Sequence, residues 1–256
     1  MNRGTIPLRQ SACLAAALSL TLASFGCGTA GAGSDRTTLT VLAASSLTTV
    51  AQDLADAYEA KHPEVRLRFS LAGSQELASQ VRNGVPADVI VTADEATMSA
   101  LGKRVRDPVL VAGNTLVIVA RRGNPKSIES LADLAGNDVV TVLAAPSVPA
   151  GRYARTVLDR AGVQLKARSD EPDVRAVLTR VRLGEADAGI VYATDASAAA
   201  DDVAQVEIPP DVNVTARYPA AVLPTSGNAD QAASFVDWLR GSQSRRILRS
   251  AGFLAP

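Results

Sequence analysis

The feature that most constrains the fold is an alternation of short β-branched runs with longer amphipathic stretches. Three pairs follow one another, each a predicted strand and then a predicted helix: 39–43 and 48–61, 65–71 and 75–83, and 89–92 and 95–101. Ser45 and Ser46 stand just before the first helical pattern, and Pro63 ends it, as helix start and stop signals do. Strands that alternate with helices in this way indicate an α/β fold.

A second α/β unit begins near Gly113-Asn114. Its expected strands and helices are 115–120, 130–134, 139–144, 152–161, 174–183 and 188–192, and the chain then returns through 214–222 to a closing helix at 231–239. The chain that follows the N-terminal segment is long enough to bury a large core, either as one domain or as two lobes of about 100 residues each. We expect two lobes, the first formed by 37–113 plus 218–256 and the second, inserted into it, by 114–217.

The N-terminal segment has the layout of a secretory signal. Arg3 and Arg9 precede an uncharged apolar run, 12–25, which ends in small residues around Cys27. The run is about 14 residues long, and a membrane-spanning helix needs about 20. We therefore expect 1–27 to be a signal peptide and the protein to be exported.

Cys27 resembles the lipidated cysteine of the lipobox of bacterial lipoproteins. The small residues of 28–36 that follow it indicate a flexible tether. Ser24 and Phe25 depart from the residues usual in a lipobox, so a plain cleaved signal peptide is the alternative. We expect a protein anchored by lipid on the outer face of the cell membrane, and otherwise periplasmic or extracellular.

The composition of the remaining chain argues against several classes of function. Of 26 basic and 26 acidic residues, the segment 1–27 contains two arginines and no acid, which leaves 24 against 26; such a balance argues against nucleic-acid binding. Both cysteines, Cys13 and Cys27, lie in that segment, so disulfides and thiol chemistry are not expected. The single histidine, His62, stands at a helix end, and no Gly-x-Ser-x-Gly string is present, so a serine nucleophile lacks its usual base. We expect no catalysis, no cofactor and no metal bound directly by side chains.

Four expected helix starts have a composition that suits an anion. They read Ala44-Ser45-Ser46-Leu47-Thr48, Ala72-Gly73-Ser74-Gln75, Val148-Pro149-Ala150-Gly151 and Pro172-Asp173-Val174-Arg175. A helix start presents unpaired backbone N–H groups and the positive end of the helix dipole. Each string taken singly has an ordinary explanation, because Ser is a preferred N-cap and Pro-Ala-Gly is a common turn.

These strings and four others occur in the order seen in molybdate-binding proteins of the ModA type, which the chain resembles from about Thr38 to its C-terminus. The additional strings are Leu77-Ala78 after Gly73-Ser74, Pro86-Ala87-Asp88-Val89, Gly113-Asn114-Thr115-Leu116-Val117 and Gly189-Ile190-Val191-Tyr192-Ala193-Thr194-Asp195. The resemblance implies a type II periplasmic-binding-protein fold. In that fold two α/β lobes, joined by two crossing strands, enclose an anion in the cleft between them.

The resemblance also implies a ligand site and its partners. Its hydroxyl and backbone donors would come from Ser46 and Ser74 in the first lobe, with backbone N–H groups from Ala150 and Val174 and the phenol of Tyr192 in the second. Ser45 would cap a helix or support its neighbours. The implied ligand is molybdate, with tungstate bound comparably, and the implied partners are the permease subunits of an ABC importer; we expect a monomer.

Charged residues near the expected cleft leave some alternatives open. Arg152, Arg155 and Arg175 stand close enough to pair with a dianion, although we expect most of them to be solvated. Asp173 is the one nearby acid that would favour a protonated anion such as phosphate. Sulfate, phosphate or an organic acid as ligand, an α/β hydrolase, and a surface protein without a ligand remain the rival interpretations, since a fold does not fix a function.

Overall fold

The computed structural model describes residues 36–256. The predicted signal peptide 1–27, the lipid-attachment residue Cys27 and all of the predicted tether except Arg36 lie outside the described residues. Within 36–256, no helix combines the length and the apolar character that crossing a membrane requires.

The first lobe follows the predicted strand and helix order. Three parallel strands form its sheet, namely β1 (Thr37–Ala44), β2 (Val65–Ala72) and β3 (Val89–Val91), with β1 in the middle. The connecting helices are α1 (Ala51–Glu59), α2 (Ser74–Arg82) and α3 (Glu95–Ser99), and a 3-10 turn, η2 (Gly102–Arg104), follows them. The α/β fold class predicted from the sequence is confirmed.

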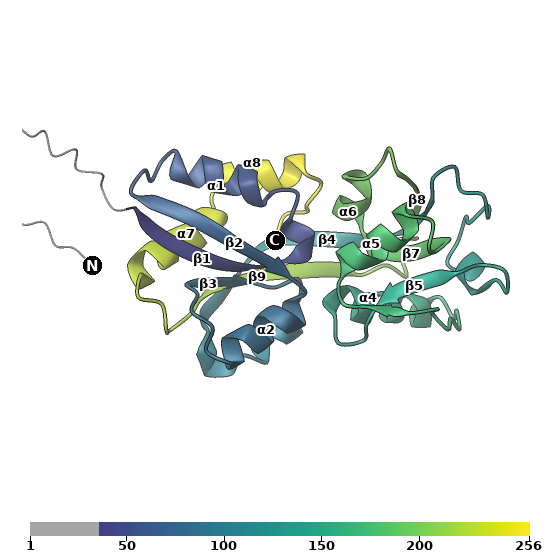
Figure 1. Cartoon of the computed structure of the whole chain (residues 1–256), viewed down its shortest axis with the longest axis horizontal. Coiled ribbons are helices and arrows are strands. Elements are labelled where there is room, and N and C mark those ends of the chain that lie inside the picture. Colours follow the sequence, from purple (N-terminus) through teal and green to yellow (C-terminus); the bar gives the residue numbers. More distant parts are fainter. Residues whose placement is uncertain (1–35) are drawn as a thin grey trace, which may run out of the picture. The chain divides into compact units, whose positions relative to one another are not determined.

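The alternation of side chains along β1 explains why this sheet has helices on both faces. Leu39, Val41 and Ala43 point into the larger core, whereas Leu42 points into a smaller core with Leu77 of α2. Successive residues of a strand face opposite sides of the sheet. Because both sets are buried, the sheet needs a cover on each side, and α1 and α2 lie on opposite faces (Figure 1).

Two long strands connect the two lobes. β4 (Arg106–Arg121) pairs antiparallel with β9 (Thr215–Val222), and the register places Gly113 opposite Arg217, the two points where the sequence suggested that the chain leaves and re-enters the first lobe. The sequence predicted only 115–120 of β4. Its first half was missed because Arg106, Asp107 and Pro108 read as a loop, and the register between β4 and β9 shifts there.

The sheet of the second lobe is formed around the C-terminal half of β4. β7 (Ala188–Tyr192) and β8 (Val203–Glu207) pair antiparallel with β4, and β5 (Thr141–Ala144) and β6 (Asp170–Glu171) extend the sheet beyond β7. Its helices are η3 (Ala132–Ala135), α4 (Pro149–Arg160), α5 (Val174–Arg182) and α6 (Ala193–Ser197). The complete strand order is β2-β1-β3-β9-β4-β7-β5-β6, with β8 beside β4. This two-lobed arrangement agrees with the prediction, while the lobe boundaries remain a prediction.

The C-terminal end of the chain differs from the expectation. The helix predicted to close the chain is α7 (Ala229–Leu239), but a further helix, α8 (Ser242–Ser250), follows it and contacts both α1 and α7 (Figure 1). α8 was missed because only Ser244 and Leu248 of its nine residues are buried. Its helical pattern is too sparse in apolar residues to stand out against the surrounding arginines.

Candidate functional site

The first side of the site begins where β1 ends. Ser45–Leu47 form a 3-10 turn, η1, and the α-helix starts only at Ala51, so the predicted helix start at 48 is three residues too early. Ser46 is almost fully buried, and its Oγ lies 2.8 Å from the Oη of Tyr218. The turn thus presents the Ser46 side chain with one hydrogen-bond partner already in place.

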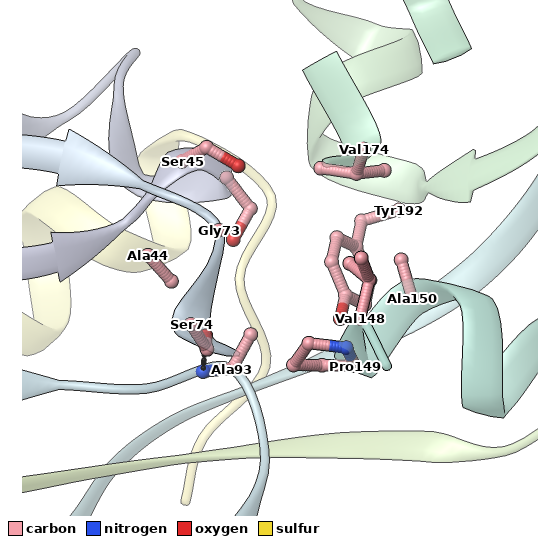
Figure 2. A pocket seen from close by; sticks show the side chains of 11 residues that line it. Ala44, Ser45, Gly73, Ser74, Ala93, Val148, Pro149, Ala150, Val174 and Tyr192 are labelled. Atoms are coloured by element: carbon pink, nitrogen blue, oxygen red, sulfur yellow. Dashed lines mark hydrogen bonds between the residues drawn. The ribbon is translucent and has the colours of Figure 1, made fainter. Parts of the chain in front are cut away.

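Ser74 is the first residue of α2, which begins one residue before the predicted range 75–83. Its Oγ accepts a hydrogen bond of 3.0 Å from the backbone N–H of Ala93, drawn as the dashed line in Figure 2. A hydroxyl has one hydrogen to donate and two lone pairs. Because Ala93 occupies a lone pair, the hydroxyl hydrogen of Ser74 remains available to a ligand.

On the second side of the site, two helix starts face the first. α4 begins at Pro149, three residues before the predicted start, so Ala150 lies in its first turn. Val174 is the first residue of α5, whose N-cap Asp173 accepts a hydrogen bond of 2.9 Å from the N–H of Ala176. The N–H groups of a helix's first turn have no partner within the helix. Asp173 is therefore occupied as a cap, and Ala150 and Val174 can offer backbone donors.

Gly151 explains how α4 can start so close to β5. A Cβ built at this position would lie 2.1 Å from the carbonyl oxygen of Ala145 and 2.3 Å from that of Ala144. Any side chain would collide with the backbone there, so glycine is required by close approach rather than by a special backbone angle. This contact fixes the first turn of α4 against the end of β5.

Tyr192 is the last residue of β7, and only 1% of its surface is exposed. Among the described residues its phenol oxygen has no hydrogen-bond partner, and burial raises the pKa of Tyr192 well above its usual value. A buried donor left without a partner costs about 1–3 kcal/mol. The neutral phenol can therefore donate a hydrogen bond to any acceptor that enters the pocket.

All five predicted site residues line one pocket (Figure 2). Its eleven lining residues carry no charged side chain, and they are Ala44, Ser45, Ser46, Gly73, Ser74, Ala93, Val148, Pro149, Ala150, Val174 and Tyr192. The expectation that Ser45 would cap a helix or stand behind its neighbours is wrong, since it lines the pocket and within the described chain its hydroxyl makes no capping bond. The cavity volume is about 10 Å³, roughly what one ordered water needs. Such a space favours a compact ligand over an extended organic molecule.

The three arginines near the pocket pair with acids of the protein, and each keeps about a third of its side-chain surface exposed, so they are partly solvated as expected. Arg152 of α4 bonds to Asp94 and, at 2.9 Å, to the hydroxyl of Thr97, both in the first lobe. The remaining two pairs lie within the second lobe, and they are Arg155 with Asp170 at 2.6 Å and Arg175 with Asp195 at 3.6 Å. The positive charges are thus balanced before any ligand enters.

Asp195 is a buried acid that the sequence did not single out. It is 1% exposed, and within the described chain neither carboxyl oxygen has a hydrogen-bond partner. Burial raises the pKa of Asp195 to about 7, and Arg175 nearby lowers it by less. Its place three residues after Tyr192 was visible in the sequence, but nothing there indicated burial.

Tyr218 is the second residue that sequence reasoning missed. The segment 214–222, which contains Tyr218, was interpreted only as the return of the chain to its closing helix, whereas the Tyr218 phenol lies within hydrogen-bond distance of the Ser46 hydroxyl. A tyrosine on a connecting strand gives no signal of such a contact, because its partner is 172 residues away.

Comparisons with known proteins agree with this arrangement. A family model described as bacterial extracellular solute-binding protein matches residues 39–254. The molybdate-binding protein ModA of Mycobacterium tuberculosis strain H37Rv is 39% identical over 221 residues, which cover 85% of each chain, and that of Escherichia coli K12 is 34% identical, with 86% of this chain and 90% of the relative covered. The structure of the Azotobacter vinelandii periplasmic molybdate-binding protein superposes with a TM-score of 0.75 at 21% identity, covering 85% of this chain and 99% of the other, which supports the fold. The chain therefore belongs to the bacterial extracellular solute-binding proteins and, among them, to the ModA-type binding proteins.

Proposed function

We propose that this protein captures molybdate outside the cytoplasm and delivers it to the permease of an ABC importer. The observation that carries the proposal is a pocket between two lobes that is lined by neutral hydrogen-bond donors and by no charged side chain. Removing an anion from water is costly unless fixed dipoles replace its hydration. Helix starts and hydroxyls supply such dipoles, and relatives at up to 39% identity are named as molybdate-binding proteins.

In this proposal each donor has a defined role. Ser46 and Ser74 give hydroxyl and backbone donors, Ala150 and Val174 give backbone N–H groups, and Tyr192 gives its phenol. Because these groups offer donors, the site favours a fully deprotonated oxyanion over hydrogen phosphate, whose own hydrogen needs an acceptor. Tungstate, which has the same charge and shape as molybdate, binds comparably.

Ligand capture in this proposal depends on closure of the lobes. Ser46 and Ser74 belong to the first lobe, and the other three donors to the second, so opening removes about half of the donors at once. Contacts that cross between the lobes favour the closed form, among them the bond of 2.8 Å from the Gln75 side chain to the carbonyl of Pro172. A closed monomer with its ligand enclosed is then the form that the permease recognises. The predicted boundaries, 37–113 plus 218–256 and 114–217, are part of this proposal.

The proposal places the protein at the outer face of the cell membrane, held by a lipid on Cys27 after cleavage of the signal peptide directly before that residue. The tether 28–36 then separates the anchor from the first strand. Cleavage without lipidation is the alternative, and mass spectrometry of the membrane fraction distinguishes the two by the presence of a lipid on Cys27.

The proposal involves no catalysis by the protein. The single histidine of the sequence, His62, stacks on the ring of Tyr58 in the first lobe and does not line the pocket. The pocket serines thus lack the imidazole that would activate one of them as a nucleophile.

Thermal unfolding with different anions tests the proposed function. A ligand that binds only the native state raises the melting temperature of the protein. With the chain from Asp35 to Pro256, which forms one compact unit, molybdate and tungstate at equal ionic strength are expected to raise Tm, and inorganic phosphate is not. A rise of Tm with sulfate alone would identify sulfate as the ligand and leave the fold assignment unchanged. No rise of Tm with any of these anions would contradict the proposal.

A further inference from the structure

Three serine hydroxyls line the pocket, and two of them are held by other protein groups. The Oγ of Ser46 lies 2.8 Å from the Oη of Tyr218, and the Oγ of Ser74 accepts the N–H of Ala93 at 3.0 Å. Ser45 lines the same pocket, but within the described part of the chain no hydrogen bond involves its hydroxyl. The protein therefore leaves the hydrogen-bonding capacity of this pocket serine unused.

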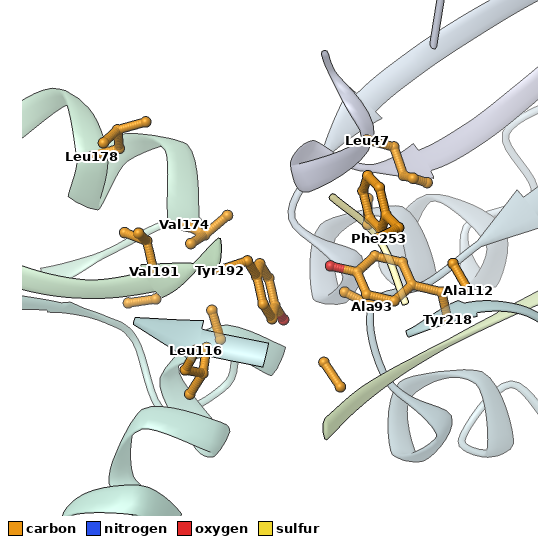
Figure 3. Packing of buried hydrophobic residues seen from close by; sticks show 14 of the residues in the cluster. Leu47, Ala93, Ala112, Leu116, Val174, Leu178, Val191, Tyr192, Tyr218 and Phe253 are labelled. Atoms are coloured by element: carbon orange, nitrogen blue, oxygen red, sulfur yellow. The ribbon is translucent and has the colours of Figure 1, made fainter. Parts of the chain in front are cut away.

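The backbone of Ser45 is fixed by the turn η1. Its carbonyl oxygen accepts the backbone N–H of Thr48 at 3.1 Å and also accepts the Thr48 hydroxyl. Leu47 holds the turn against the core, because it is 4% exposed and belongs to the same cluster of buried residues as Phe253 (Figure 3). With its backbone held in this way, Ser45 can redirect its hydroxyl only by rotating its side chain.

The Ser45 hydroxyl points across the pocket. Figure 2 shows its oxygen directed from the first lobe toward the second, at the level of Val174, the first residue of α5. Only 8% of the surface of Ser45 is exposed, so the side chain does not extend into bulk solvent. A ligand enclosed between the two lobes lies in the direction in which this hydroxyl points.

The fold itself gives no reason for a hydroxyl at this position. Buried hydroxyls in folded proteins nearly always bond to a protein group or to an ordered water. An alanine at position 45 would keep both bonds of the carbonyl oxygen, because neither of them uses the side chain. A partner that enters the pocket therefore accounts for the Ser45 hydroxyl better than the stability of the turn does.

We propose that Ser45 is a further ligand-binding residue, whose hydroxyl donates a hydrogen bond to one oxygen of a tetrahedral oxyanion in the pocket. This inference rests on the proposed function of the same pocket, and it adds a third hydroxyl to those of Ser46 and Ser74. Those two hydroxyls are positioned by Tyr218 and Ala93, whereas the Ser45 hydroxyl rotates to meet the ligand. A hydroxyl has one hydrogen to donate, and no protein acceptor in the described chain competes for that of Ser45.

The variant Ser45→Ala tests this role by calorimetric titration with molybdate. Loss of one hydrogen bond to a charged acceptor should raise the Kd about tenfold. The Tm of the ligand-free variant should stay within about 2 °C of the native value, because no bond within the protein is removed. Ser74→Ala also removes the acceptor of the Ala93 N–H, so this second variant should lower the Tm of the ligand-free protein. The comparison separates a hydroxyl that serves the ligand from one that also serves the fold.

Thr48→Val is the matched control for the turn. It removes a hydroxyl that bonds to the Ser45 carbonyl and lies outside the pocket, so the Kd for molybdate should change by less than about threefold. A Kd for Ser45→Ala within about twofold of the native value would overturn the inference. An equal loss of affinity in Thr48→Val would also overturn it, because the effect would then belong to the turn. A native protein that does not bind molybdate would instead count against the proposed function.

Discussion

The two sides of the pocket supply hydrogen-bond donors in different ways. On the first side, Ser46 and Ser74 contribute side-chain hydroxyls, each held by another protein group. On the second side, Ala150 and Val174 have apolar side chains and can contribute only backbone N–H groups, while Tyr192 adds a phenol that has no partner among residues 36–256. Side-chain donors are removed by ordinary substitutions, whereas backbone donors persist through most of them. The two sides should therefore respond to mutation in different ways.

The largest effect is expected from removing the hydroxyls of both Ser46 and Ser74 on the first side. Ser46→Ala and Ser74→Ala should each raise the Kd for molybdate about tenfold or more, since a hydrogen bond to a charged acceptor contributes about 1.5–3 kcal/mol. The double variant should lose at least a hundredfold by calorimetric titration. Ser79→Ala, further along α2 and outside the pocket, is the matched control. Unchanged Kd in both single variants would refute the assignment of these serines.

A backbone donor of the second side can be removed by proline. Val174→Pro is well placed, because position 174 is the first of α5 and the preceding Asp173 has extended angles of −158° and 175°, which suit a residue before proline. We expect the Kd for molybdate to rise about tenfold to a hundredfold through loss of one N–H. Val174→Ala keeps that N–H and should change the Kd by less than about threefold; a similar loss in both variants would show that the side chain matters instead.

A smaller effect is expected from breaking a contact between the two sides. Arg152→Met removes the bonds from α4 to Asp94 and Thr97, which should speed release of molybdate about three- to tenfold, as the loss of a partly exposed ion pair does. Arg155→Met is the matched control, because the bonds of Arg155 stay within the second lobe. Equal release rates for the two variants in stopped-flow experiments would argue against a closing role for Arg152.

The smallest effect on binding, but a measurable effect on stability, is expected at Asp195. Its pKa is about 7 in the folded protein and 3.8 in the reference state. The native state therefore holds this proton more tightly than the unfolded chain does, so the associated stability is fully present below about pH 4 and is lost as the pH rises to about 7. Asp195→Asn should remove the part of the pH-dependent loss of stability that Asp195 causes. The Tm of the variant should therefore fall less steeply than that of the native protein between pH 4.5 and 7.5. Parallel Tm curves for the variant and the native protein would contradict the shift.

The sequence revealed the second side of the pocket less well than the first. Ser46 and Ser74 are polar residues at strand ends and attract notice by themselves, yet the 3-10 turn at Ser45–Leu47 was taken for the start of an α-helix. Ala150 and Val174 are ordinary apolar residues. The helix starts that contain them suggested backbone donors, but only the resemblance to a family singled out these two residues. Composition cannot indicate an N–H donor, because every residue except proline has one.

Contacts between segments that are distant in the sequence could not be predicted either. Tyr218 and Asp195 acquire their significance from burial beside groups of other elements, and one sequence carries no record of those pairs. The same limitation explains why β4 was predicted too short. Its first half opens with Arg106, Asp107 and Pro108, and it is a strand only because β9 supplies the neighbouring hydrogen bonds.

The close contact at Gly151 offers a diagnostic for reading other sequences of this kind. The first turn of α4 reaches the pocket only because no Cβ separates it from the carbonyls that end β5. A homologue with alanine or a larger residue at the equivalent position must route this segment differently and move the amide of the preceding residue. The presence of glycine at this position can therefore distinguish homologues that keep the first turn of α4 at the pocket from those that do not, even where every pocket side chain is the same.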